Sequence, residues 1–285
     1  MTERIGHFQI LGTLGSGAHS TIIHIRRQND GKPYALKIVP IHGAGDHKFR
    51  EQAQHEFRVA RMLDHPNLIK IYALETVRDW LFRVRKLHLL IEYVNGRTLD
   101  TLKRLRVPQL LQLFSCTAAA IVHMHRRGVY HADLKPHNIL LSRTGEVKII
   151  DYGLAWIRGE NKNRLQGTPE FMAPEQVKKS TVNEKTDIYN LGATMYRLAT
   201  WRNPPNALAA KGDLALNSQT WNQLFKPVGD LNPEIPPEFC HLIHRCLAFN
   251  PHQRPERMSE VKENIDWLAG KWVKGPEDGL DGVQW

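Results

Sequence analysis

The sequence contains few cysteines and no pattern that would pair them. Its 285 residues include three, Cys116, Cys240 and Cys246, and none of them lies in a C-x-x-C pair. Cysteines so few and so scattered exclude a disulfide framework and give no indication of a zinc site. Such usage is typical of a protein in a reducing compartment.

Other absences narrow the class of protein further. The segment Met1–Gly6 carries an acidic residue and lacks the apolar stretch of a signal peptide. No apolar run approaches the ~20 residues that a membrane span needs. The phosphate-binding pattern GxxxxGK[ST] is also missing, which excludes a P-loop nucleotide site. We therefore expect a cytoplasmic protein without a membrane span.

Composition and charge are those of a globular protein. Apolar residues make up 41% and charged residues 24% of the sequence, and the length suits one large or two small domains. The net charge of +10 could serve a nucleic acid or an anionic membrane surface. The densest basic clusters, 83–86 and 103–106, contain no interleaved aromatic residues that would stack on bases. Because the basic residues are scattered, we interpret the charge as a mixed surface rather than a nucleic-acid site. The sequence does not indicate an oligomeric state.

The strongest chemical signal is the stretch His-Ala-Asp-Leu-Lys-Pro-His-Asn at 131–138. It places Asp133, Lys135 and Asn138 within six residues, and Asp151 follows thirteen residues later. One carboxylate can orient an attacking hydroxyl and accept its proton, and the lysine can offset charge on a migrating phosphoryl group. The amide and the second carboxylate can hold magnesium. Solvated loops contain similar sets, so this interpretation requires further parts elsewhere in the chain.

The first forty residues predict a β-meander. Strands are expected at 8–14, 21–27 and 34–39, with a glycine-rich segment between the first two and a turn at 29–32. A dinucleotide-binding fold would place a helix directly after the glycines. Lys37 lies in the third strand, which is otherwise apolar. Its ammonium group needs a partner there, unless the strand is an edge that faces water.

The remaining chain predicts mostly helices. Helical periodicity is found at 50–64 and 108–126, and a closing helix is expected at 256–268. His123 and His125 lie near the end of the second helix. We interpret both as capping or surface residues, because nothing nearby has the spacing of metal ligands.

Strands and loops fill the intervals. Apolar runs at 68–74 and 87–94 are joined by a long basic segment, and 139–150 predicts a small hairpin. Residues 204–237 are rich in proline, asparagine and glycine, which predicts loops with some helix. Residues 269–285 are expected to form a loosely held tail.

Several of these segments resemble the motifs of one family. Residues 131–138 resemble the HRDLKPxN catalytic loop of protein kinases, and Asp-Tyr-Gly at 151–153 resembles their DFG motif. Further kinase-like motifs occur in the family's order: the VAIK-like strand 34–39, the HPN turn 65–67, the loop Gly167–Met172 that positions substrate, Ala-Pro-Glu at 173–175, the DxWxxG-like helix start 187–192, and Arg254 as the partner of Glu175. The resemblance covers about Phe8 to Leu268.

This resemblance implies an α+β fold of the bilobal protein-kinase type. A small antiparallel β-sheet lobe with one main helix is expected at about 8–91, and a larger, mainly helical lobe at 98–268. A hinge at 92–97 would join them, with ATP bound between the lobes. The kinase domain would then comprise residues 1–268, followed by a short tail at 269–285.

The resemblance also implies residue roles. Asp133 would orient the acceptor hydroxyl and take its proton, Lys135 would contact the γ-phosphate, and Asn138 and Asp151 would hold Mg²⁺, or Mn²⁺ in its place. Asp187 would support the backbone of the catalytic loop. The implied ATP-binding residues are Leu14, Gly15, Ser16, Gly17, Ala18, Ser20, Ile22, Ala35, Lys37, Glu56, Ile91, Glu92, Val94, Thr98 and Leu140.

The partner of Lys37 is selected by spacing within the motif. Glu56 lies nine residues before His65 of the HPN turn, the position of the glutamate on the family's αC helix. We therefore expect Glu56, rather than Glu51, to pair with Lys37.

Two departures from the family pattern bear on regulation. Ser20 replaces the third glycine of the nucleotide loop, and Ala132 replaces the arginine that normally receives an activation-loop phosphate. The segment from Leu154 to Gly167 contains no Ser, Thr or Tyr. A phosphate switch needs both a hydroxyl and an arginine acceptor. We predict activity that does not depend on phosphorylation of this segment.

The implied function is transfer of the γ-phosphoryl group of ATP to a Ser or Thr hydroxyl of a protein. Lys135 in Asp-Leu-Lys-Pro resembles serine/threonine rather than tyrosine kinases. Thr98, His137 and Arg197 stand where kinases that prefer arginine carry acids. We therefore expect a neutral or acidic substrate sequence, unless these residues touch no substrate.

Two other functions remain open. A pseudokinase would bind ATP without turnover; Ser20 and Ala132 favour this weakly, whereas the intact set of phosphate, metal and proton contacts opposes it. A kinase for small molecules is opposed by the peptide-positioning loop of the activation segment, because small substrates need no such platform.

Overall fold

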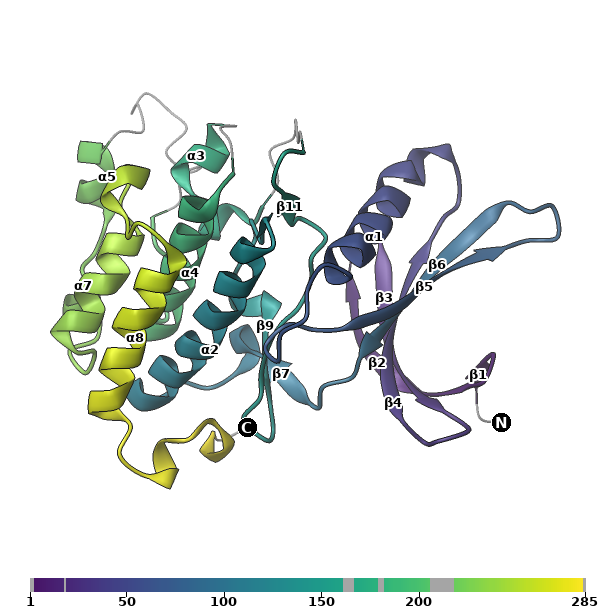
Figure 1. Cartoon of the computed structure of the whole chain (residues 1–285), viewed down its shortest axis with the longest axis horizontal. Coiled ribbons are helices and arrows are strands. Elements are labelled where there is room, and N and C mark those ends of the chain that lie inside the picture. The colour runs from purple at the N-terminus through teal and green to yellow at the C-terminus, as the bar shows by residue number, and fades with distance from the viewer. Residues whose placement is uncertain (1–2, 18, 161–166, 179–181, 206–217, 284–285) are drawn as a thin grey trace. The chain divides into compact units, whose positions relative to one another are not determined.

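The computed structural model describes residues 3–17, 19–160, 167–178, 182–205 and 218–283 (Figure 1). Packing divides the chain into two units. The first unit comprises Met1–Asp64, Leu68–Asn95 and Asp151–Gly153, and the second comprises His65–Asn67, Gly96–Ile150 and Leu154–Trp285. The first unit is built around a β-sheet, and the second is built mainly from helices.

The first unit contains a six-stranded antiparallel sheet in the order β1-β2-β3-β4-β6-β5. Its strands are β1 (Arg4–Ile5), β2 (Phe8–Gly17), β3 (Ser20–Arg27), β4 (Pro33–Pro40), β5 (Ile71–Arg78) and β6 (Val84–Glu92). The predicted meander is confirmed. The first strand runs further than expected, because the glycine-rich residues continue the β2–β3 ladder as far as the pair Gly17 and Ser20.

The register sorts side chains onto two faces of this sheet. Ile23 lies opposite Leu36 in the ladder, and both belong to an apolar cluster with Ile25. Neighbouring residues on a strand point to opposite faces. Ile22 and Lys37 form the adjacent cross-strand pair, so they lie on the face opposite this cluster.

The helix α1 (His47–Ala60) packs against β4, β5 and β6. It starts before residue 50 and stops before residue 64, the limits predicted from the sequence. A short 3₁₀ turn, Ala44–Asp46, precedes it. Its buried residues are Ala53, Glu56, Val59 and Ala60. A charged residue on the buried face of an amphipathic helix needs a partner in the sheet.

The connection between β5 and β6 differs from the expected long basic segment. The two strands form one continuous hairpin in which Arg78 lies opposite Val84, so the turn is confined to Asp79–Arg83. The strands extend because β-favouring residues such as Thr76, Val77 and Val84 continue the ladder beyond the apolar runs.

The second unit is mainly helical. Its helices are α2 (Val107–Arg126), α3 (Pro174–Val177), α4 (Glu184–Thr200), α5 (Ser218–Leu224), α6 (Val228–Leu231), α7 (Pro237–Cys246) and α8 (Met258–Trp272). The long helix α2 packs against α8 and α4. Among the described residues, α2 is the one helix long and apolar enough to cross a membrane, and most of that stretch is buried inside the fold. The core helix of a globular unit passes the same test.

Short strands and turns complete the second unit. One sheet has the order β10-β9-β7, formed by β10 (Val147–Ile149), β9 (Ile139–Ser142) and β7 (Gly96–Thr98). A second small sheet pairs β11 (Trp156–Ile157) with β8 (Val129–Tyr130). The remaining 3₁₀ turns are Leu99–Thr101, Pro136–Asn138, Pro169–Phe171, Pro251–Gln253, Pro276–Asp278 and Leu280–Gly282. The hairpin predicted at 139–150 is confirmed by the pairing of β9 with β10.

The described residues that follow α8 are held against α2, so the expectation of a loosely held tail is wrong. The side-chain amides of Gln109 and Gln112 donate to the carbonyl oxygens of Gly279 and Asp278, at 3.4 and 2.8 Å. Arg106 contacts the Asp278 carboxylate at 3.3 Å. Composition could not predict these contacts. Glycine and proline indicate a loop, but they do not indicate which side chains will bind the backbone of that loop.

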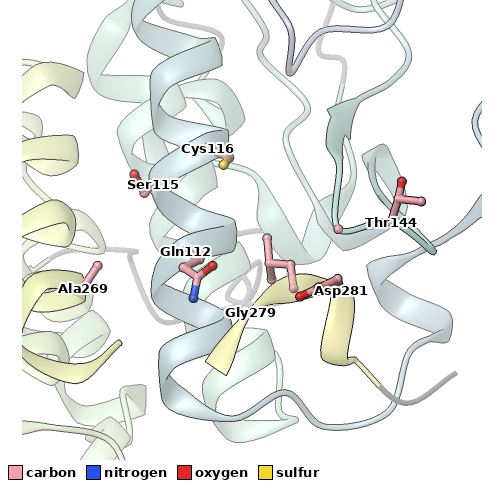
Figure 2. A pocket seen from close by; sticks show the side chains of 9 residues that line it. Gln112, Ser115, Cys116, Thr144, Ala269, Gly279 and Asp281 are labelled. Atoms are coloured by element: carbon pink, nitrogen blue, oxygen red, sulfur yellow. The ribbon is translucent and has the colours of Figure 1, made fainter. Parts of the chain in front are cut away.

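A pocket of about 410 Å³ lies between α2, the β9–β10 turn and this terminal segment (Figure 2). Gly145 in the turn has φ +84°, and a Cβ on it would lie 3.0 Å from the backbone nitrogen of Asp281. The turn therefore requires glycine for both its conformation and the close approach of the terminal segment. None of the residues lining the pocket was predicted as a site residue.

Candidate active site

The stretch 131–135 follows β8, and the side chain of one residue on α4 fixes its backbone. The carboxylate of Asp187 accepts hydrogen bonds from the backbone N–H groups of His131 and Ala132, at 2.9 and 2.8 Å. Ala132 has φ +65°, a conformation that is unfavourable for a residue with a side chain. Two charge-assisted hydrogen bonds hold the chain in this conformation, as predicted for Asp187.

The carboxylate of Asp133 lies at the centre of a polar cluster. Lys135 Nζ is 2.9 Å from its Oδ2 atom, and Asn138 Nδ2 donates to the Asp133 carbonyl oxygen at 2.9 Å. The backbone N–H of Thr168 donates to Oδ1 at 2.8 Å, and the Lys135 ammonium donates to the Thr168 hydroxyl. Asp133 is buried, and these contacts hold its carboxylate in one orientation.

Asp187 has a third partner, His125 of α2. His125 Nε2 lies 2.8 Å from Asp187 Oδ2, and its Nδ1 lies 3.1 Å from Glu184 Oε1. Although burial lowers the pKa of the imidazole, the two carboxylates outweigh it and raise the pKa of His125 to about 9. The interpretation of His125 as a capping or surface residue is therefore wrong, because its side chain is buried in an ion-pair cluster.

In the first unit the predicted pair of Lys37 and Glu56 is present. Lys37 Nζ lies 2.7 Å from Glu56 Oε2, and the Glu56 side chain is only 4% exposed. Burial lowers the pKa of Lys37, but the carboxylates of Glu56 and Asp151 outweigh it, so the pKa is raised overall. Lys37 is therefore a fixed positive charge on the face of the sheet opposite the Ile23 cluster.

Asp151–Gly153 also belongs to the first unit. The backbone N–H of Gly153 donates to Asp151 Oδ1 at 2.9 Å, and Asp151 has φ +71°. Tyr152 is fully buried, and its hydroxyl donates to the carbonyl oxygen of Ile69 at 2.9 Å. A Cβ on Gly153 would lie 2.7 Å from the side-chain nitrogen of Gln52. The close packing of the two residues that follow Asp151 holds this segment, and the Gly153 N–H fixes one oxygen of the Asp151 carboxylate.

The residues predicted to bind ATP lie on elements of both units. Leu14 sits at a bulge near the end of β2 and is 48% exposed, and Gly15, Ser16 and Gly17 complete that strand. Ala18 lies outside the described residues. Ser20 and Ile22 are on β3, Ala35 and Lys37 on β4, and Ile91 and Glu92 end β6.

The cross-strand pairs show which of the residues predicted to bind ATP share a face of the sheet. Ala35 lies opposite Ile91 on β6, and Ile22 lies opposite Lys37. These four positions therefore share one face of the first unit's sheet. Val94 follows β6 in the first unit, whereas Thr98 and Leu140 form a cross-strand pair between β7 and β9 of the second unit.

The predicted ion pair anchors the end of residues 151–175, the stretch that resembles the activation segment of kinases. Arg254 Nη1 and Nη2 lie 2.7 and 2.9 Å from the two carboxylate oxygens of Glu175, and the Arg254 side chain is 0% exposed. Residues 161–166, within the stretch that lacks hydroxyl side chains, lie outside the described residues.

The sequence did not identify two residues that the structure brings to this site. Thr168 contacts both Asp133 and Lys135, although only its loop was recognised. Gln176 of α3 donates to the Ala132 carbonyl at 2.8 Å and accepts from the Ala173 N–H at 2.9 Å. Glutamine in a short helix gives no sequence signal. Its spacing to the Ala-Pro-Glu motif was the available clue.

The donor set of the site fits a hard divalent cation. Asn138 uses its amide nitrogen for hydrogen bonds to Asp133, so its carbonyl oxygen is the atom left for a ligand. Carboxylate and amide oxygens are the ligands that Mg²⁺ accepts together with phosphate oxygens. Among the described residues there is no cluster of three or more His, Cys, Asp or Glu side chains that could hold a metal alone. Phosphate oxygens would therefore have to complete a magnesium site.

The fold and these contacts define the class of protein. Residues 8–267 match the family model of the protein kinase domain, and the chain belongs to that family. Its fold is of the mixed α+β class, with an antiparallel sheet in one unit and mainly helices in the other.

Three relatives of this chain are named serine/threonine-protein kinases. The chain is 27% identical over 271 residues to a probable serine/threonine-protein kinase of Streptomyces coelicolor, a match that covers 92% of this chain and 40% of that protein. It is 28% identical over 268 residues to the serine/threonine-protein kinase PrkC of Bacillus subtilis, covering 91% of this chain and 40% of PrkC. The serine/threonine-protein kinase PknD of Chlamydia pneumoniae is 27% identical over 306 residues, with 93% and 32% covered. The chain thus spans two fifths or less of the length of these three relatives.

Proposed function

We propose that this chain is an active serine/threonine protein kinase that transfers the γ-phosphoryl group of ATP to a hydroxyl of a protein. The arrangement around Asp133 is the observation that carries the proposal. A buried carboxylate with an ammonium group at 2.9 Å is held by a backbone N–H of the loop that precedes α3. This geometry suits a carboxylate that orients an acceptor hydroxyl and takes up its proton.

The remaining roles follow from the chemistry of each group. Lys135 contacts the transferred phosphoryl group, and Lys37, held by Glu56, contacts the α- and β-phosphates. Asn138 and Asp151 would hold Mg²⁺, which would supply neutralisation of the phosphate charge. The face of the first unit's sheet with Ile22, Ala35 and Ile91 receives the adenine.

The proposal includes independence from activation-loop phosphorylation. The Thr168 hydroxyl receives a hydrogen bond from Lys135, and the Thr168 backbone contacts Asp133. A phosphate on this hydroxyl would place a dianion beside the Asp133 carboxylate and displace Lys135 from it. Phosphorylation of Thr168 should therefore inhibit rather than activate.

We also propose that the substrate sequence carries no required arginine near the acceptor hydroxyl. Arg197 donates to the carbonyl oxygen of Trp201, and its guanidinium lies 5.6 Å from the centroid of the Trp201 ring, so its charge is partly committed. His137 is 69% exposed, but its Nδ1 lies 3.3 Å from Asp100 Oδ2. Thr98 and His137 offer no free carboxylate to a basic peptide. We expect no selection for arginine, and a neutral substrate sequence fits best.

The domain boundaries and the location are also part of the proposal. The kinase domain is assigned to residues 1–268, with a hinge at 92–97 and a short terminal segment at 269–285. The cytoplasm is the proposed location, because the cysteines are free and two of the three, Cys240 and Cys246, are buried.

The test is a phosphotransfer assay with a matched control. The purified chain is incubated with Mg-ATP and a protein rich in serine and threonine, and the products are analysed by mass spectrometry. Phosphoserine or phosphothreonine is expected with the wild type and with Asp230→Asn, an exposed carboxylate on α6. It should be lost with Asp133→Asn.

Three other outcomes would each overturn the proposal. ATP binding without product in any variant would indicate a pseudokinase. Phosphorylation of small molecules alone would indicate a kinase of the other substrate class. Equal activity in the wild type and Asp133→Asn would remove Asp133 from the mechanism.

A further inference from the structure

The β5–β6 hairpin extends past the strand beside it. The strand β4 pairs with β6 only as far as the pair of Pro40 and Lys86, followed by one hydrogen bond from the Ile41 N–H to the Arg85 carbonyl. Beyond that point the β5–β6 ladder continues with the pair of Arg78 and Val84 and then the turn, seen projecting from the sheet in Figure 1. A two-stranded ribbon without a third strand is only marginally stable in water. Its turn must therefore be stabilised locally.

Asp79 supplies that stabilisation. One of its carboxylate oxygens accepts the backbone N–H groups of Leu81 and Arg83 at 2.9 and 3.0 Å, and the other accepts Arg85 Nε at 2.9 Å. The Phe82 N–H donates to the Asp79 carbonyl at 3.0 Å, and the Arg78 side chain donates to the Phe82 carbonyl at 2.9 Å. Most backbone polar groups of the turn are thus satisfied internally, which lowers the cost of placing the turn in a medium of low polarity.

The fixed turn directs three large apolar side chains to solvent. Trp80 is 84%, Leu81 45% and Phe82 79% exposed. Phe82 has φ +60°, so its backbone adopts an unfavourable conformation while its ring remains outside the fold. Side chains of this kind are usually buried, so the exposure of both aromatic rings at one turn indicates that they contribute little to the packing of the first unit.

Basic residues surround this apolar tip. Between residues 78 and 86 there are four basic side chains, Arg78, Arg83, Arg85 and Lys86, and one acidic side chain, Asp79, a net charge of +3. All four basic residues are exposed, and Asp79 is engaged by the turn itself. An apolar tip with a basic base is complementary to a surface that is anionic outside and apolar inside.

The dimensions of the tip decide between a lipid surface and a protein. Three side chains of this size bury at most about 500 Å². A specific protein interface buries about 800 Å² on each partner and needs a complementary shape. A bilayer needs no complementary shape, and aromatic side chains favour its interface.

We propose that the β5–β6 hairpin is a membrane-docking element, in which Trp80, Leu81 and Phe82 enter the interface of a bilayer and the surrounding basic residues bind anionic lipid headgroups. This inference is independent of the proposed phosphotransfer. From the sequence, we interpret the net charge of +10 as basic residues scattered over the surface. The basic cluster at 83–86 is an exception, because it lies at the base of this apolar tip. The aromatic residues that accompany it precede it in the chain instead of interleaving with it.

Vesicle binding tests the proposal directly. The full chain is sedimented with vesicles of phosphatidylcholine and phosphatidylglycerol, and with vesicles of phosphatidylcholine alone. Binding is expected only to the anionic vesicles and should weaken with added salt, which screens the headgroup charges. The double variant Trp80→Ser/Phe82→Ser should lose at least about tenfold in partitioning. Arg83→Gln/Lys86→Gln should lose about fivefold for each basic residue removed.

Two matched variants control for exposure and for charge. Trp267→Ser removes a tryptophan that is 53% exposed on α8, and Lys103→Gln/Arg104→Gln removes two of the three basic residues of the other dense cluster, 103–106. Both should bind as the wild type does. Brominated phosphatidylcholine should quench the fluorescence of Trp80, and this quenching should vanish in Trp80→Phe while sedimentation persists.

Several results would overturn the proposal. These are no binding to either vesicle, equal loss in the control and hairpin variants, or tip variants that bind anionic vesicles as the wild type does. The last result, together with a protein partner that is lost in the tip variants, would assign the hairpin to protein recognition.

Discussion

Replacing His125 by glutamine removes one positive charge from the cluster that holds the catalytic loop. Glutamine can still donate a hydrogen bond to Asp187, but it cannot carry a charge between Asp187 and Glu184. The folded state raises the pKa of His125 from 6.5 to about 9. This interval corresponds to about 3 kcal/mol of folding free energy, at about 1.4 kcal/mol for each pH unit.

The sign of the pH dependence follows from the direction of that change. Because the folded state binds the proton more tightly, the contribution is fully present below the unfolded pKa of 6.5 and is lost as the pH rises through about 9. The difference in unfolding free energy between wild type and His125→Gln should therefore shrink by about 3 kcal/mol from about pH 6 to about pH 9.5. Packing losses do not depend on pH and cancel in this comparison.

Urea unfolding at several pH values, followed by circular dichroism, measures this difference. His252→Gln is the control, because His252 is an exposed histidine in the turn Pro251–Gln253. Its difference from wild type should stay constant across the range. If the His125→Gln difference also stays constant, the imidazole carries no proton in the cluster and the argument fails.

Two further substitutions test other buried groups. Arg254→Met should lower the unfolding free energy by about 3–5 kcal/mol, because it leaves the Glu175 carboxylate without its partner. The double variant with Glu175→Leu should recover much of this loss in urea unfolding, and a single variant that costs under about 1 kcal/mol would contradict the account. Tyr152→Phe should cost about 1 kcal/mol in the same assay, since the Ile69 carbonyl loses its donor. An unchanged or raised midpoint would mean that burying the hydroxyl costs as much as its hydrogen bond returns.

Spacing within motifs predicted the long-range pairs well. Lys37 was matched to Glu56 rather than Glu51, and Arg254 to Glu175, and both ion pairs are present. Such pairs are predictable because a buried charge needs a partner, and a helix or a turn leaves few positions from which one can reach it. Strand and helix existence also followed from periodicity, whereas the boundaries of α1 and of the β5–β6 hairpin did not.

Contacts made by backbone or by unremarkable polar residues could not be predicted. His125 was interpreted as a capping or surface residue because nothing nearby in sequence has the spacing of metal ligands, yet its partners come from α4, about sixty residues away. Thr168 contacts Asp133 through its backbone N–H, which every residue other than proline possesses. Such contacts form where two segments far apart in sequence pack together, and the pattern of residues within each segment does not predict which positions will be in contact.

The terminal segment after α8 lies beyond the limit of the family match and is nevertheless bound to α2. The family match stops at residue 267, but Gln109 and Gln112 of α2 still bind carbonyl oxygens of residues 278 and 279. The contacts of this fold therefore continue more than ten residues past the limit of the family model. A variant that ended at that limit would lack the carbonyl partners of both glutamines and would expose one side of α2, a surface prone to self-association.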